Sequence, residues 1–306
     1  MATFGLHRRD VLAGIGAALV LPAGPVSAAA FKRKVGAAEI TVLGDGTLNV
    51  PLAMVMPETP PADAAAVSAA LGVPPPGSAI PTNVTLVALG NERVLIDAGA
   101  GSNFQPTAGK LAENMEAAGI DPATITKVVF THAHADHLWG VIDEFDELRF
   151  PKASYVIAAA EWDFWTDPNT PTSVPDWLKG MALGSARILK RLEDKLERRK
   201  AGDVVAPGLS YTATLGHTPG HMSVLLENGP ERLLIGGDVL THAAISFARP
   251  EWRLGTDFDR DQAVATRRRL LDRLASDRLP LLGFHLPSPG FGMVERSGAA
   301  YRFVPG

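Results

Sequence analysis

Residues 131–137 read THAHADH, and no other stretch of the chain says as much about its architecture. They follow an apolar run at 127–130 that is typical of a β-strand. Side chains two positions apart in an extended segment project to the same side, so His132 and His134 can bind one metal ion together. Asp136 and His137 come after the chain turns and can reach a second ion. Because the chain has only 8 histidines, this grouping predicts a metal site rather than core packing.

Three more ligand-type residues stand beside glycines or at the ends of apolar runs, where loops gather at one sheet edge. His217 lies in GHTPGH (216–221), Asp238 closes LLIGGD (233–238) and His285 follows LLGF (281–284). With the first cluster they provide five imidazoles and two carboxylates. That set is enough for two divalent ions with Asp238 between them and one position open to solvent.

Composition excludes several other classes of protein. The 306 residues include 29 Lys and Arg against 33 Asp and Glu, a formal charge of -4, so a general nucleic-acid binder is not expected. The chain has no cysteine, which excludes disulfides, thiolate metal sites and cysteine nucleophiles. Any metal must therefore be bound by nitrogen and oxygen. With 46% hydrophobic residues the chain can bury a substantial core.

The amino terminus has the pattern of an export signal. Arg8 and Arg9 precede an uncharged stretch at 11–30 that ends in small residues. Residues 1–30 are therefore predicted to be a signal peptide of the twin-arginine type, and 31–306 to form the exported catalytic domain, periplasmic or secreted and away from the membrane. A retained membrane anchor is the alternative.

Short branched apolar runs alternate with helical patterns, which predicts a layered α/β protein. Strands are expected at 40–43, 84–89, 94–97, 127–130, 154–158, 223–226, 233–235 and 281–284. Helices are expected at 110–118, within 183–199, and at 259–275. The proline-rich residues 51–81 predict a surface loop or flap with a short helix around 63–71.

Two segments of the chain have similar sequence patterns. LVALGNERVLIDAG (86–99) and LLENGPERLLIGGD (225–238) both read as strand, turn, strand and glycine with aspartate. Their separation is far longer than a solenoid repeat, so two similar halves are expected. A chance likeness between two hairpins is the alternative.

Together these motifs resemble the metallo-β-lactamase fold superfamily over most of the chain after Glu39. The resemblance implies a four-layer αβ/βα sandwich with two similar halves. It also implies two metal ions, with zinc expected first and manganese, iron or cobalt as alternatives. Carried over, the ligands of one ion are His132, His134 and His217, those of the other are Asp136, His137 and His285, and Asp238 bridges. Asp136 and Asp238 are then the carboxylates expected to serve catalysis by anchoring the ions.

The carboxyl-terminal segments narrow this resemblance. GDVLTHAAISF (237–247), HLPSPGFG (285–292) and YRFVPG (301–306) are similar to the methyl parathion hydrolase branch, whose members are exported dinuclear enzymes. That branch includes phosphotriesterases, and related lineages contain lactonases. Trp139 replaces the small residue that is common after the histidine motif, and is expected to narrow the pocket.

The expected reaction is hydrolysis of a small neutral ester, lactone or phosphotriester. Two ions about 3.5 to 4 Å apart lower the pKa of a shared water to near 7, and the resulting hydroxide attacks the substrate. The alternatives are a β-lactamase-like or glyoxalase II-like hydrolase, a mononuclear iron dioxygenase of the same superfamily, and a periplasmic metal-binding protein without turnover. A homodimer is left open.

Several neighbouring residues are weaker candidates. Substrate contact is expected from Trp139, Trp165, Phe247 and His242, with Met54 and Met56 from the flap, and the competing interpretations are core packing for the aromatic residues and a loop role for His242. His221 is expected to shape a turn or to support a ligand from behind, and direct metal binding is the alternative. Asp97 is expected either to orient a metal-binding histidine or to shape a turn.

Overall fold

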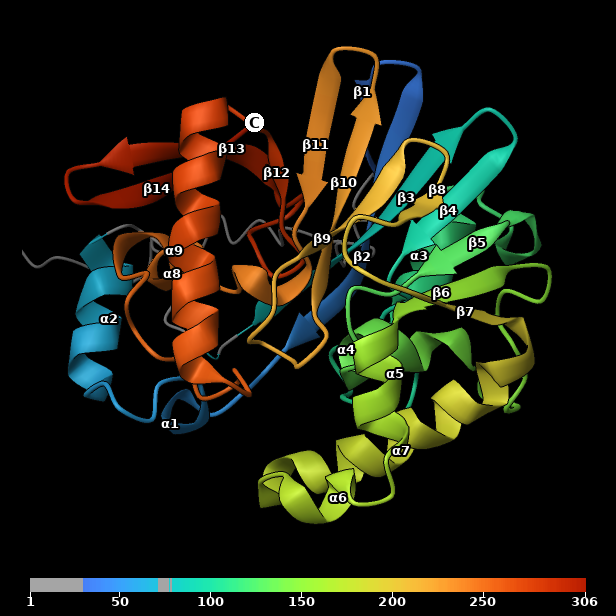
Figure 1. Ribbon diagram of the computed structural model, residues 1–306, viewed down its shortest axis with the longest axis horizontal. Helices are drawn as coiled ribbons and strands as arrows, with labels where there is room; N and C mark the ends of the chain where they lie inside the picture. Colours follow the sequence, from blue (N-terminus) through green and yellow to red (C-terminus); the bar gives the residue numbers. More distant parts are fainter. Residues whose placement is uncertain (1–29, 71–76, 78) are drawn as a thin grey trace, which may run out of the picture.

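The computed structural model describes residues 30–70, 77 and 79–306. Two seven-stranded sheets pack face to face, and helices cover the outer face of each sheet (Figure 1). This arrangement confirms the predicted four-layer sandwich. Residues 1–29 of the predicted signal lie outside the described residues. Within the described ranges, no helix combines the length and the apolar character needed to cross a bilayer.

The first sheet has the strand order β1-β2-β3-β4-β5-β6-β7. Its strands are β1 (Phe31–Val35), β2 (Ala38–Leu48), β3 (Ile80–Leu89), β4 (Glu92–Ile96), β5 (Lys127–Val129), β6 (Ser154–Ala158) and β7 (Leu196–Arg199). Pairing is antiparallel from β1 to β4 and parallel from β4 to β7. The helices of this half are α3 (Leu111–Ala117), α4 (Ala135–Leu138), α5 (Ala159–Thr166), α6 (Thr170–Ser173) and α7 (Asp176–Leu192).

The second sheet has the order β14-β13-β12-β11-β10-β9-β8. Its strands are β8 (Val204–Ala206), β9 (Leu209–Ala213), β10 (Met222–Asn228), β11 (Glu231–Ile235), β12 (Leu281–Leu282), β13 (Phe291–Ser297) and β14 (Ala300–Pro305). Only the β11–β12 pair is parallel among these described strands. The helices of this half are α8 (Ile245–Ala248) and α9 (Arg260–Asp277), and the insertion between β2 and β3 adds α1 (Leu52–Val55) and α2 (Pro61–Ala70).

Along the central strands, alternate side chains pack into different layers of the sandwich. Val94 and Ile96 of β4 pack into the core between the two sheets, whereas Leu95 packs toward the helices of the first half. In β11, Leu233 and Ile235 point into the same central core and Leu234 points toward α9. Because successive strand residues face opposite sides, a strand buried on both faces reads as a continuous apolar run.

The two similar halves predicted from the similar sequence patterns are confirmed. Leu86 of β3 pairs with Leu95 of β4, and Leu225 of β10 pairs with Leu234 of β11, in equivalent antiparallel hairpins. The second strand of each hairpin then pairs in parallel with the next strand, β5 or β12. The metal-site histidines of 132–137 follow β5, and His285 follows β12.

The predicted helix within 183–199 is wrong in its second half. α7 begins earlier, after Pro175, and ends at Leu192. The chain then makes a 3-10 turn and continues as β7, where Leu196 pairs with Tyr155 of β6. Pairing at the sheet edge therefore overrides the helical spacing of the leucines, and it lets Arg198 stack on the Trp162 ring, with 3.9 Å from the guanidinium carbon to the ring centroid. Five further strands were not expected from the sequence: β1, β8, β9, β13 and β14.

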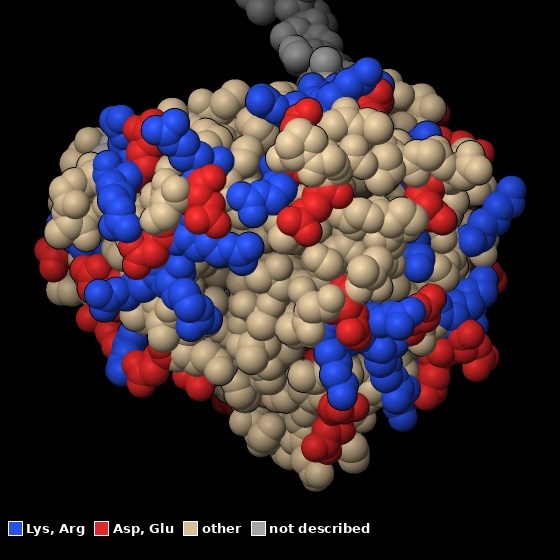
Figure 2. Space-filling model, turned by 45° about the horizontal axis from the view of Figure 1, so that its top comes forward, with Lys and Arg blue, Asp and Glu red and all other residues tan. Residues whose placement is uncertain are grey.

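The surface carries charges of both signs. On the face shown in Figure 2, basic and acidic side chains are interspersed around a broad area of other residues. Charged side chains of opposite sign also pair on the surface of the protein, as Arg296 does with Asp272 at 2.8 Å and Arg187 with Asp146 at 2.8 Å. This face therefore presents no extended field of a single sign.

Candidate metal centre

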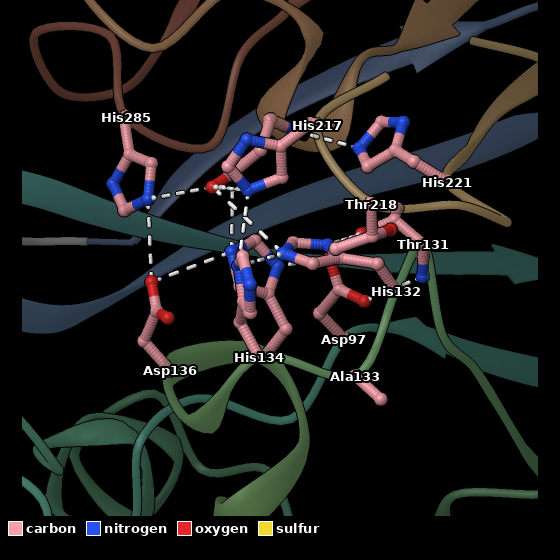
Figure 3. A network of polar contacts seen from close by, with 12 residues as sticks. Asp97, Thr131, His132, Ala133, His134, Asp136, His217, Thr218, His221 and His285 are labelled. Atoms are coloured by element: carbon pink, nitrogen blue, oxygen red, sulfur yellow. Dashed lines mark hydrogen bonds and ion pairs between the residues drawn. The ribbon is translucent and has the colours of Figure 1, made fainter. Parts of the chain in front are cut away.

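Four loops at one edge of the two sheets bring the predicted ligands together (Figure 3). They follow β5, β9, β11 and β12, and the first of them leads into the short helix α4. All seven side chains are buried: His132, His134, Asp136, His137, His217, Asp238 and His285. Residues separated by more than 150 positions thus meet in one cluster, as they must if they share metal ions.

One group of four contains three imidazoles and a carboxylate: His132, His134, His217 and Asp238. The His134 Nδ1 atom lies 3.0 Å from His132 Nε2 and 3.0 Å from His217 Nε2. The Asp238 Oδ2 atom lies 3.3 Å from His217 Nε2 and 3.9 Å from His132 Nε2. These four atoms therefore converge on one point.

The second group contains two imidazoles and two carboxylates: Asp136, His137, Asp238 and His285. His285 Nε2 lies 3.2 Å from Asp136 Oδ2 and 3.2 Å from Asp238 Oδ2. His137 Nε2 lies 3.3 Å from Asp136 Oδ2 and 3.1 Å from Asp238 Oδ1. Asp238 belongs to both groups, so its carboxylate occupies the position between them.

The chemistry of this cluster fits divalent cations. Asp136 Oδ2, His137 Nε2 and Asp238 Oδ1 are buried, and none forms a hydrogen bond with any described residue. Buried polar atoms normally have partners, so three such atoms in one cluster call for an explanation. Imidazole nitrogens and carboxylate oxygens converging without sulfur are ligands suited to zinc and related ions.

The outward ring nitrogens of four histidines have partners of their own. His137 Nδ1 lies 2.8 Å from Asp97 Oδ2, His217 Nδ1 lies 3.0 Å from Asp257 Oδ1, His285 Nδ1 donates to the Pro81 carbonyl at 2.8 Å, and His132 Nδ1 lies 3.1 Å from Thr131 Oγ1. Such partners fix the ring orientation and leave the inner nitrogen available as a ligand. Asp97 thus takes the orienting position, the first of the two expected for it.

His221 lies behind the ligands and supports Asp238. Its Nε2 accepts the Asp238 backbone N–H at 2.9 Å, and its Nδ1 lies 2.9 Å from Thr214 Oγ1. Burial lowers the pKa of His221 to about 3, so the ring is neutral and able to accept that bond. Gly237 has a φ of +58° and a Cβ there would lie 2.8 Å from His221 Nε2, so this turn requires glycine.

The charges inside the cluster stabilise its carboxylates. Burial opposes ionisation of Asp238, yet His285 and His137 hold the pKa of that carboxyl well below its usual range. Burial also places the pKa of His132 and His134 well below the usual value, so these two rings are neutral. The neighbouring carboxylates outweigh burial and raise the pKa of His137, His217 and His285, so metal binding would displace protons from these three rings.

Sequence reasoning missed three buried residues around the site. Asp257, in the loop before α9, contacts His217 and forms a 2.8 Å ion pair with Arg267 of α9. Glu161 of α5 accepts hydrogen bonds from the loops that carry the histidines. No sequence pattern marks any of them, because each is an ordinary charged residue in a loop or a helix and becomes distinctive only through its burial.

A pocket of about 260 Å³ opens onto both ligand groups. Apolar side chains from the ends of β2 and β3, the insertion between them, the loop after β4, α7 and α8 form much of its wall: Leu48, Val50, Met54, Met56, Ile80, Phe104, Met181 and Ile245. His242 lines the pocket, and its Nδ1 accepts the backbone N–H of Ala244 at 3.1 Å. Met54 and Met56 of the insertion also line this pocket.

The predicted pocket roles of Trp139 and Phe247 are wrong. Trp139 lies against Gly184 of α7 and donates to Ser185 Oγ at 3.1 Å, outside the residues that line this pocket. Phe247 is fully buried in the core beneath α9, where it packs against Phe303. Trp165 lines a neighbouring groove and contacts the edge of His134, with 5.5 Å between the ring centroids.

Comparisons with known proteins agree with this geometry. Residues 77–285 match the family model described as the metallo-beta-lactamase superfamily. AidC, a dizinc quorum-quenching lactonase, superposes with a TM-score of 0.84 at 27% identity, over 91% of this chain and 97% of that one. The hydrolase AbOPH of the beta lactamase superfamily gives 0.83 at 27% identity, over 90% of this chain and 97% of that one.

A curated relative matches over a shorter stretch. The N-acyl homoserine lactonase AttM of Rhizobium radiobacter is 29% identical over 124 residues, 37% of this chain. The match spans 40% of the length of that relative.

Proposed function

Because the chain belongs to the metallo-beta-lactamase superfamily, we propose that it is a metal-dependent hydrolase that opens a neutral lactone or ester carrying an apolar chain. The observation that carries the proposal is the pair of four-residue ligand groups sharing Asp238 at the end of an apolar pocket. The lactonases AidC and AttM support the substrate class.

The pocket wall favours a neutral, apolar substrate. Met54, Ile80, Phe104 and Ile245 are suited to an alkyl chain, which gains about 0.8 kcal/mol for each methylene removed from water. The described residues that line the pocket include no lysine or arginine. An anionic group placed away from the metal ligands would therefore have no cationic side chain of the described wall to pair with.

The ligand residues fall into two sets, one for each ion. His132, His134 and His217 would hold one ion, Asp136, His137 and His285 the other, and Asp238 both. Two divalent cations held there, which we propose to be zinc, would supply hydroxide at neutral pH and polarise a substrate carbonyl. Asp97 and Asp257 keep the rings of His137 and His217 oriented through hydrogen bonds. The apolar wall limits the access of bulk water to the reacting carbonyl.

Elemental analysis combined with a substrate panel tests the proposal. We expect two divalent ions per chain and turnover of an N-acyl lactone in preference to an aryl ester, a phosphotriester and a β-lactam, with activity lost after chelation and restored by zinc. A preference for the phosphotriester would instead favour the methyl parathion hydrolase branch. One iron per chain would point to a dioxygenase, and bound metal without any turnover would contradict the hydrolase.

Replacing Met54 with glutamine is expected to reduce selectivity for long acyl chains. The side chains are similar in size, but the amide places polar atoms against the alkyl chain, at a cost of about 1 kcal/mol, or roughly fivefold. The ratio of kcat/KM for a long-chain lactone to that for a short-chain lactone should fall by this factor. Met293→Gln, in β13 and outside the pocket lining, is the matched control. Equal ratios in the two variants would contradict the assignment of this wall to the acyl chain.

A further inference from the structure

Glu161, in the first turn of α5, is completely buried and accepts four hydrogen bonds. Its Oε2 accepts the Ala133 N–H at 3.0 Å and the Trp165 Nε1–H at 2.6 Å. Its Oε1 accepts the Gly220 N–H at 2.8 Å and the Thr218 hydroxyl. Each carboxylate oxygen therefore serves two donors, and none of these donors is a cationic side chain.

Three of these bonds join α5 to the two loops that carry one group of metal ligands, and the fourth comes from Trp165 of α5 itself. Ala133 lies between His132 and His134, and Thr218 follows His217 directly. Trp165 adds an edge contact to the His134 ring. Among the hydrogen bonds of the described residues, none joins Glu161 to the other group's own ligands, which are Asp136, His137 and His285.

The backbone around Glu161 is held closely from other directions as well. Ser185 of α7 donates to the Ala133 carbonyl at 2.7 Å, so both polar backbone atoms of Ala133 are bonded to buried side chains. A Cβ on Gly220 would lie 2.4 Å from the Glu161 backbone nitrogen, so α5 and the GHTPGH loop approach as closely as glycine allows. The loops therefore have little freedom to move relative to Glu161.

We propose that Glu161 is a positioning residue for the subsite formed by His132, His134 and His217. It holds the two loops at the spacing that one ion requires, and it sets the affinity of that subsite without acting on the other. This inference rests on the proposed metal-binding function. Partners behind metal ligands typically change metal affinity by about 10- to 100-fold when they are removed.

Glu161→Gln separates positioning from simple packing. The glutamine side chain has nearly the same size, but its amide nitrogen cannot accept hydrogen bonds. One pair of donors would therefore lose its acceptor: either Ala133 N–H and Trp165 Nε1–H, or Gly220 N–H and the Thr218 hydroxyl. In either orientation one of the two loops loses its connection to α5.

The experiment measures zinc affinity by competition with a chromophoric chelator, without substrate. Glu161→Gln is combined with His285→Ala, which leaves the proposed subsite intact, and separately with His134→Ala, which disables it. We expect the dissociation constant to rise about 10- to 100-fold in the His285→Ala protein and to change less than about twofold in the His134→Ala protein. Tyr155→Phe, which removes a buried hydroxyl bonded to the Phe150 carbonyl, is the control for general loss of stability and should leave both affinities unchanged.

The outcomes separate this inference from the proposed function. Equal changes in both backgrounds, or no change in the His285→Ala protein, would overturn the role of Glu161 while the parent protein still binds two zinc ions. A parent protein that binds no zinc would refute the proposed function itself. If circular dichroism shows that Glu161→Gln does not fold, Thr218→Val replaces it in the experiment. Valine keeps the shape of the threonine side chain but removes one of the four hydrogen bonds. This variant should weaken zinc binding about tenfold in the His285→Ala protein alone. No change there would overturn the inference.

Discussion

Asp238→Ala is expected to lower kcat/KM for lactone hydrolysis by at least about 10³-fold, or about 4 kcal/mol of barrier, and to remove bound metal from both subsites. The reason is that Asp238 alone belongs to both ligand groups. Its Oδ1 lies 3.1 Å from His137 Nε2, and its Oδ2 lies 3.2 Å from His285 Nε2 and 3.3 Å from His217 Nε2. Without this carboxylate, each group loses a ligand and the negative charge that balances a cation.

Metal content after dialysis and steady-state kinetics check this prediction together. Asp194→Ala, which removes an exposed carboxylate from the turn after α7, is the matched control and should retain both ions and full activity. Circular dichroism distinguishes loss of metal from loss of fold. An Asp238→Ala protein that keeps two ions per chain and turns over at the parent rate would contradict the shared-ligand arrangement.

The ligand cluster could be predicted because its members stand at the ends of strands. Parallel strands of one sheet end at the same edge. The polar residues directly after β5, β11 and β12 can therefore be expected to lie close together without any detailed knowledge of packing. Asp97 could be predicted for the same reason, since it follows β4. Asp257 could not, because it lies in an irregular loop and meets His217 only after α9 has packed against the second sheet.

Aromatic residues near the motifs could not be assigned from sequence in the same way. Trp139 and Phe247 both follow metal-site motifs closely, yet one packs against Gly184 and the other enters the core beneath α9. The direction of a side chain in a short turn or helix depends on the backbone rotation after the last ligand, and hydrophobicity does not encode it. The end of α7 was missed for a related reason, since edge pairing with β6 decides whether Leu196 lies in a helix or a strand.

Arg267→Met is expected to lower the free energy of unfolding by about 3 to 5 kcal/mol, because it leaves the carboxylate of Asp257 buried without its cation. Arg267 lies almost completely inside the protein and donates to Asp257 Oδ2 at 2.8 Å, to the Trp252 carbonyl at 2.9 Å and to the Pro250 carbonyl at 3.2 Å. Methionine fills part of the same volume but satisfies none of these acceptors. The variant therefore tests the ion pair rather than the packing of α9.

Denaturant unfolding of the metal-free proteins gives the measurement, since bound ions would add stability to the folded state by mass action. Arg268→Met, at the next and exposed position of the same helix, is the control and should change stability by less than about 0.5 kcal/mol. Adding Asp257→Asn to Arg267→Met removes the stranded charge and should recover part of the loss. If Arg267→Met were no more destabilising than the control, the buried pair would contribute nothing to the fold.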